Sequence, residues 1–145
     1  MTTPTRPRLG PRTRVALALG AAALLAALGV ARTLEPDPRG FGTHERLGLP
    51  PCASRLRTGV GCPTCGMTTS WALATRGRPR ESWRASPAGC LLAPGSGLLA
   101  AWMACSAASG RPRPFRTASG PMAGAVVVAS ASGLAAWILR TYWSG

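Results

Sequence analysis

The chain has 145 residues, of which 46% are hydrophobic, and its formal net charge at pH 7 is +13. All 17 basic residues are arginines, and only four residues are acidic. These four carboxylates are scattered along the sequence and form no pair of the kind that general acid and base catalysis requires. No Ser-His-Asp set and no phosphate-binding glycine loop is present, so we expect neither hydrolase nor transferase chemistry.

The arginines gather in three clusters, "TRPRLGPRTR", "RGRPRESWR" and "GRPRPFR", each beside an apolar run. Aromatic residues do not alternate with them and no recognition-helix pattern is present, so we expect no binding to nucleic acid. Arginines beside apolar runs are typical of segments that meet anionic lipid headgroups. The clusters therefore predict contact with a lipid bilayer, in which they would anchor and orient the protein.

Residues 1–14 form a tail of Pro, Thr and Arg that we expect to be disordered. The first apolar run, residues 15–31, has no polar side chain and is about long enough to cross a hydrocarbon core of about 30 Å. Two alternatives stay open. The run could be a cleaved signal peptide, although it is longer than usual, or part of a soluble helical bundle, although it has no polar face.

Residues 32–87 connect this run to the next and hold most of the chemical variety of the chain, including its single histidine. The stretch "PPCASRLRTGVGCPTCG" shows neither strand alternation nor a helical period, so its order would come from something other than a hydrophobic core. "MTTSWALATRG" predicts a short helix with Met67, Trp71 and Ala74 on its buried face, ended by Gly77 and Pro79. "ESWRASP" predicts a further turn.

Two more apolar runs follow, and both are long enough to span a bilayer. They are residues 88–109 and 121–139, separated by a basic loop at 110–120 and followed by a tail at 140–145. Trp137, Tyr142 and Trp143 lie near the end of the last run, where aromatic rings prefer the headgroup level. The sequence thus predicts an all-α integral membrane protein with about three transmembrane helices. Arginines before the first run favour an N-terminus inside the cell.

The cysteines give the strongest chemical signal. Cys62 and Cys65, in a Cys-Pro-Thr-Cys-Gly turn, can face one tetrahedral metal ion, and Gly66 suits that turn because glycine tolerates a positive φ. A structural zinc ion takes four ligands, and Cys52 and His44 could complete the set. Because the connecting segment lacks a core of its own, a zinc ion would supply the missing order. His44 could equally be a solvated loop residue.

Two other uses of the cysteines remain open. A Cys-Pro-x-Cys motif that begins a helix is also typical of thiol-disulfide oxidoreductases, although no strand pattern precedes Cys62. A structural disulfide from Cys52 to Cys62 would leave Cys65 unpaired. Cys90 and Cys105 are too far apart along one helix to bridge, so we interpret them as small apolar packing residues.

"LGLPPC", "TGVGCPTCGMTTSWALATRG" and "SPAG", followed by an apolar run, resemble the small bacterial membrane family catalogued as domain of unknown function 2752. The resemblance covers less than half of the chain and implies a multi-pass protein of the bacterial inner membrane, without implying an activity. Two positions depart from the family pattern, since Thr69 replaces the usual Arg and Ser86 the usual Asn. The matching residues are Cys52, Thr58, Gly59, Cys62, Pro63, Cys65, Gly66, Thr68, Gly77 and Pro87.

The sequence therefore predicts a small integral membrane protein whose connecting segment is organised by zinc at Cys52, Cys62, Cys65 and His44. We expect an accessory or assembly role with a protein partner. The alternatives are a membrane thiol-disulfide oxidoreductase that uses Cys62 and Cys65, and a purely structural membrane protein.

Overall fold

The computed structural model describes residues 8–111, 124, 127–128, 131–135 and 137–139, and within these ranges it contains helices and no strand. Prolines stand in the first turn of three of the helices, where the missing N–H costs no hydrogen bond. The elements are α1 (Pro11–Thr33), the 3₁₀ helix η1 (Thr43–Leu47), α2 (Ala53–Thr58), α3 (Met67–Ala74), α4 (Pro79–Ala85) and α5 (Pro87–Ser109).

Two of these helices, α1 and α5, are long and apolar enough to cross a membrane, with mean hydropathies of 2.0 and 1.5. They correspond to the first two predicted spans, and α1 begins at Pro11, four residues before the apolar run. The third predicted span, residues 121–139, lies only partly within the described residues, and those that are described there are helical. The prediction of an all-helical chain is confirmed for the residues that the structure describes, and the third membrane crossing stays a prediction.

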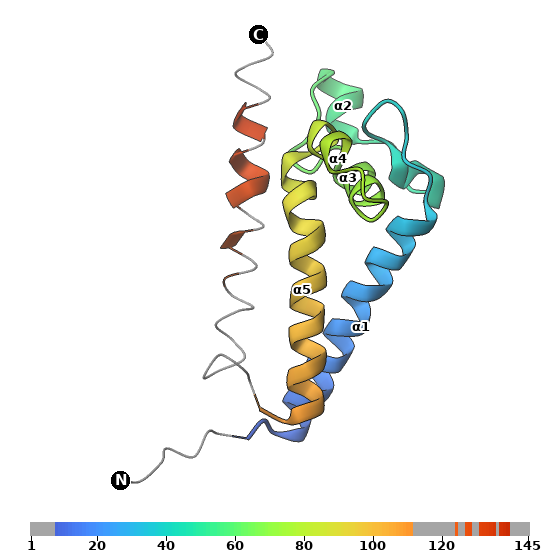
Figure 1. Cartoon of the computed structure of the whole chain (residues 1–145). Helices are drawn as coiled ribbons and strands as arrows, with labels where there is room; N and C mark the ends of the chain where they lie inside the picture. The colour runs from blue at the N-terminus through green and yellow to red at the C-terminus, as the bar shows by residue number, and fades with distance from the viewer. Residues whose placement is uncertain (1–7, 112–123, 125–126, 129–130, 136, 140–145) are drawn as a thin grey trace.

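Helices α1 and α5 meet closely at one end and splay apart at the other (Figure 1). At the closed end Leu17 and Ala21 of α1 pack against Met103 and Ala107 of α5, and Gly20 leaves room for the tip of Met103. Arg14 fastens this end, since its Nε donates to the carbonyl oxygen of Ala107 at 2.7 Å. Small residues thus let the two backbones approach, as is usual between helices in a bilayer.

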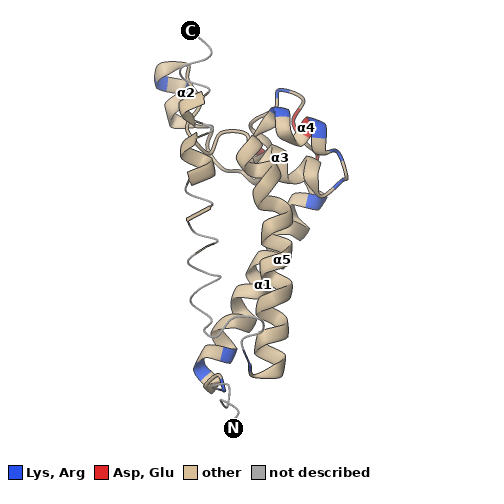
Figure 2. Ribbon diagram, turned by 60° about the vertical axis from the view of Figure 1, so that its left-hand side comes forward, with Lys and Arg blue, Asp and Glu red and all other residues tan. Residues whose placement is uncertain are grey.

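The short helices form a cap over the open end of the pair, and α3 lies between α1 and α5 (Figure 1). Arg76, just after α3, donates from Nη1 to the carbonyl oxygen of Ala31 near the end of α1 at 3.3 Å and to that of Ala72 at 2.8 Å. The basic residues lie at the two ends of the helix pair, and the middle of both helices carries none (Figure 2).

The cap differs from the sequence prediction in three respects. Residues 53–58 form the helix α2, and "ESWRASP" forms most of α4 where we expected a turn. The helix α3 itself is confirmed, but its buried face is wrong: Met67, Trp71 and Ala74 are only half-buried. The fully buried face consists of Thr69, Ser70, Ala72 and Leu73. The reason is that α3 is held by hydroxyl contacts, which a search for apolar periodicity does not detect.

Candidate metal centre

The structure brings three cysteines together. The Sγ atoms of Cys52, Cys62 and Cys65 all lie within 4.8 Å of one another. Cys65 is buried, with 7% of its surface exposed, whereas Cys52 and Cys62 are half-buried. The three come from two segments, because Cys52 precedes α2 while Cys62 and Cys65 lie in the turn before α3. None of the three cysteines forms a disulfide in the described part of the chain.

A β-turn places Cys62 and Cys65 on the same side of the backbone, since the Cys65 N–H donates to the Cys62 carbonyl at 2.9 Å. Two glycines next to this turn stand where a side chain would collide with neighbouring atoms. A Cβ on Gly61 would lie 3.1 Å from the Cys65 sulfur. Gly66, which precedes the first residue of α3, has a φ of +81°, and a Cβ there would lie 2.6 Å from the Ala85 carbonyl oxygen and 2.7 Å from that of Gly40.

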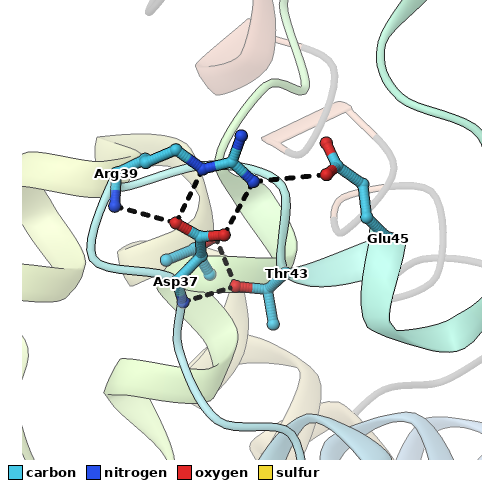
Figure 3. A network of polar contacts seen from close by, with 5 residues as sticks. Asp37, Arg39, Thr43 and Glu45 are labelled. Carbon is cyan, nitrogen blue, oxygen red and sulfur yellow. Dashed lines mark hydrogen bonds and ion pairs between the residues drawn. The ribbon is translucent and has the colours of Figure 1, made fainter.

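The loop that includes Gly40 is itself fixed by a polar network (Figure 3). Asp37 accepts hydrogen bonds from the side chain of Arg39, and Arg39 also reaches Glu45 at 3.2 Å. The Asp37 N–H donates to the Thr43 hydroxyl at 3.0 Å, and this hydroxyl bonds that of Thr69 in α3 at 2.7 Å. The hydrogen bonds from Arg39 lower the pKa of Asp37 to about 2. The network ties the loop to the helix that follows the cysteine turn.

A second buried cluster joins α3 to α4 and α5. The Ser70 hydroxyl lies 2.7 Å from that of Ser82 and 2.9 Å from the carbonyl oxygens of Ser82 and Ser86. Ser82 in turn bonds the Ser70 carbonyl at 2.9 Å. Gly89 of α5 packs so closely against Ser70 that a Cβ there would lie 2.7 Å from the Ser70 Cβ. The helix that follows the turn with Cys62 and Cys65 is therefore joined to α4 and α5 by buried hydrogen bonds.

The three thiols differ in their electrostatic surroundings. Backbone N–H groups of Arg55 and Cys62, together with the Cys62 thiol, lower the pKa of Cys52 to about 7. Burial raises the pKa of the Cys65 thiol, and negative charge on Cys52 and Cys62 raises it further, whereas a hydrogen bond from the Arg55 side chain opposes this rise. The Arg55 guanidinium carbon lies 3.6 Å from the centre of the Phe41 ring, which holds the side chain in place.

The other predicted site residues lie elsewhere. His44 is in η1, half-buried, and is not part of the group of ligand atoms that the three cysteines form. Cys90 in α5 is half-buried, and its sulfur lies 3.7 Å from the Pro79 carbonyl oxygen. Cys105 is exposed, so its interpretation as a packing residue is wrong for the described part of the chain. It lies on a face of α5 that α1 does not cover.

Sequence reasoning did not identify Arg55, whose side chain bonds Cys65, or Phe41, whose ring lies against Arg55. The signal for Arg55 was available, because it lies three residues after Cys52, about one helical turn along the chain. Phe41 had no such signal, since its contact with Arg55 depends on how the loop from Pro36 to Gly42 folds back over α2. Aromatic rings in turn-rich loops carry no periodicity from which a partner could be predicted.

The donor set fits a soft metal ion. Thiolates favour zinc and Cu(I) over magnesium and calcium. In a tetrahedral zinc site with Zn–S distances of about 2.3 Å the sulfurs lie about 3.8 Å apart, so these three would need to draw together by about 1 Å at most. Within its described residues the structure thus shows a helical protein with two candidate membrane helices and a cysteine triad that could hold a metal ion.

The comparison with protein families agrees with the resemblance found in the sequence. Residues 52–100 match the model of a family described as protein of unknown function (DUF2752). The matched range begins at Cys52, contains the whole cysteine triad with α3 and α4, and ends inside α5. No curated protein and no solved structure is significantly similar to the chain. The chain therefore resembles this family over about a third of its length. The family's description names no activity.

Proposed function

We propose that the protein is a small integral membrane protein whose cap is stabilised by a zinc ion bound to Cys52, Cys62 and Cys65. The observation that carries this proposal is the convergence of the three sulfurs within 4.8 Å, from two segments that have little hydrophobic core of their own. A bound ion would join the start of α2 to the turn before α3, because one ligand comes from the first segment and two from the second.

Membrane insertion is supported by the composition of α1 and α5, whose described surfaces expose many large apolar side chains. Leu19 and Leu25 of α1 and Leu98 of α5 are more than half exposed. In water such a surface would favour aggregation, whereas in a bilayer it would contact lipid tails. Helix α1 also supplies half of the core between the two long helices, which supports a retained helix over a cleaved signal peptide.

The metal would have a structural role in an accessory or assembly component. An ion with only three protein ligands leaves one position for water or another small ligand. Among the described residues no histidine or carboxylate joins the triad to fill it. Arg55 beside Cys65 would offset the negative charge of three thiolates on a divalent ion.

Elemental analysis of the protein purified in detergent tests this proposal. We expect about one equivalent of zinc, and we expect Cys52→Ser, Cys62→Ser and Cys65→Ser each to remove most of it, because losing one of three ligands greatly weakens the site. Cys90→Ser and Cys105→Ser are matched controls that should keep the metal. His44→Ala should also keep it, since His44 lies outside the triad.

A thiol-disulfide oxidoreductase is the second candidate, favoured by the closeness of the same sulfurs. It predicts a metal-free protein in which oxidant forms a reversible Cys62 to Cys65 disulfide. The thiol with the lowered pKa, however, is Cys52, outside the Cys-Pro-Thr-Cys motif. Metal-free protein with that disulfide would refute the zinc site and support the oxidoreductase.

A further inference from the structure

A large cleft opens between the cap, the beginning of α5 and the described residues of the C-terminal helical segment. Its volume is about 1300 Å³. The loop from Pro36 to Phe41 and helix α4 line one part of it, and Leu91, Ala135 and Leu139 line another. This volume exceeds that of an ordinary pocket for a small molecule, which is about 300–1000 Å³. The cleft therefore suits a larger, elongated ligand.

The cleft carries uncompensated positive charge. Four arginines line it, and two of them are paired within the protein: Arg39 with Asp37 and Glu45, and Arg78 with Glu81. Arg55 is turned to the cysteines, since its side chain donates a hydrogen bond to Cys65, whereas Arg84 forms no ion pair with any described residue. Because charged groups at the edge of an apolar surface attract opposite charge strongly, an anionic group would be favoured at Arg84.

The apolar part of the cleft continues along a candidate membrane helix. Leu91 lies in the first turns of α5 and is 54% exposed, and Trp83 on α4 is 52% exposed. Tryptophan and arginine beside the end of a spanning helix are typical of the headgroup level of a bilayer. Arg84 would then lie where lipid phosphates lie, while Leu91 would lie toward the hydrocarbon.

We propose that this cleft binds one anionic phospholipid, with its phosphate at Arg84 and an acyl chain along Leu91. Arg84 lies in α4, directly before α5, and Leu91 lies further along the candidate membrane helix α5, so the order of charge and apolar surface matches that of phosphate and acyl chain in such a lipid. This inference rests on the membrane placement proposed above and is independent of the bound metal. Arg84, which lies outside the cysteine triad, is the residue that tests it.

The experiment uses the full chain reconstituted in nanodiscs of equal parts phosphatidylglycerol and phosphatidylcholine. Native mass spectrometry of the released protein gives the ratio of retained phosphatidylglycerol to retained phosphatidylcholine. We expect a preference for phosphatidylglycerol that Arg84→Gln lowers about fivefold, as expected for one arginine at a lipid surface. Arg80→Gln is the matched control, since Arg80 is exposed on the same helix and does not line the cleft.

Other outcomes separate the possible failures. Equal effects of Arg84→Gln and Arg80→Gln, or no preference in the wild type, would overturn the lipid site. Loss of retained phosphatidylglycerol on adding inorganic phosphate would assign Arg84 to a free anion instead. Arg84→Lys keeps the charge and should therefore retain the preference for phosphatidylglycerol. If both Arg84 variants lose this preference and also lose zinc, the variants are misfolded, and this assignment of Arg84 is refuted. Extraction of the protein from membranes by alkaline carbonate would instead refute the membrane placement itself.

Discussion

Gly66 is the residue on which the position of the cysteine turn depends most. Its φ of +81° lies in the left-handed region, and carbonyl oxygens of Ala85 and Gly40 close on it from two sides. Only a residue without a Cβ satisfies both conditions. Gly59 shares the first condition, with a φ of +73°, but nothing lies within 4 Å of the place where its Cβ would be.

We therefore expect Gly66→Ala to destabilise the fold more than Gly59→Ala. Both variants incur the cost of a left-handed backbone, about 1–3 kcal/mol. Gly66→Ala also forces two carbonyl groups aside, which should add at least about 1 kcal/mol. Thermal unfolding of the two variants in the same detergent gives the difference. Equal losses of stability would show that Ala85 and Gly40 do not confine this residue.

The identity of Thr69 also has a structural explanation here. At this position the resemblance leads us to expect an arginine, but Thr69 is fully buried and its hydroxyl pairs with that of Thr43. An arginine in the same place would bring an unpaired charge into a site that holds only a small polar group. In this chain, the pair of hydroxyls takes on the task of joining α3 to the preceding loop.

The contact between α1 and α5 depends on small residues at one level of the helix pair. Gly20 faces the end of Met103, whereas Gly29, nine residues further along the same helix, has nothing within 4 Å of its Cβ position. A leucine at Gly20 would have to displace Met103 from the core that also includes Leu17 and Ala107.

We expect Gly20→Leu to destabilise the helix pair by about 1–3 kcal/mol, as is usual when a well-packed interface is overfilled. Gly29→Leu should leave stability unchanged or raise it by up to about 1 kcal/mol, since leucine has the higher helix propensity and nothing lies within 4 Å of its Cβ position. It is the matched control because both glycines lie inside α1. Thermal unfolding monitored by circular dichroism compares the two. A similar loss in both variants would contradict the packing described for α1 and α5.

The long helices and α3 could be predicted from the sequence, because apolar length and terminating glycines are local signals. The helices α2 and α4 could not, since each has only one or two turns and no apolar period. In the candidate site, Cys62 and Cys65 were predictable as a pair from their spacing. The structure confirms that Cys52 lies with this pair, which its spacing in the sequence only suggested. His44 is close to Cys52 in the sequence but lies outside the group of three sulfurs.

The molecule as a whole has a basic end near Arg14, a basic cap and an apolar middle. This distribution predicts that the two ends face opposite sides of a membrane. Arginines before the apolar run of α1, Arg12 and Arg14 among them, favour the inside for the end that carries them, which places the cap outside.

Two single-cysteine reporters, each in a background without native cysteines, test this arrangement. Arg57→Cys lies exposed on α2 in the cap, and Ser109→Cys lies exposed at the opposite end of α5. We expect a membrane-impermeant maleimide to label Arg57→Cys in intact cells and Ser109→Cys only after lysis. The reverse pattern would invert the orientation, and labelling of both in intact cells would argue against a membrane crossing by α5.

The central claim is that three thiolates and no fourth thiolate bind one metal ion in the cap. X-ray absorption spectroscopy at the zinc edge of the purified protein tests this most directly. We expect three sulfur ligands at about 2.3 Å and one lighter ligand, because Cys90 and Cys105 lie outside the triad. A zinc ion with four sulfur ligands, a zinc ion without sulfur ligands, or protein that contains no metal would each contradict the account.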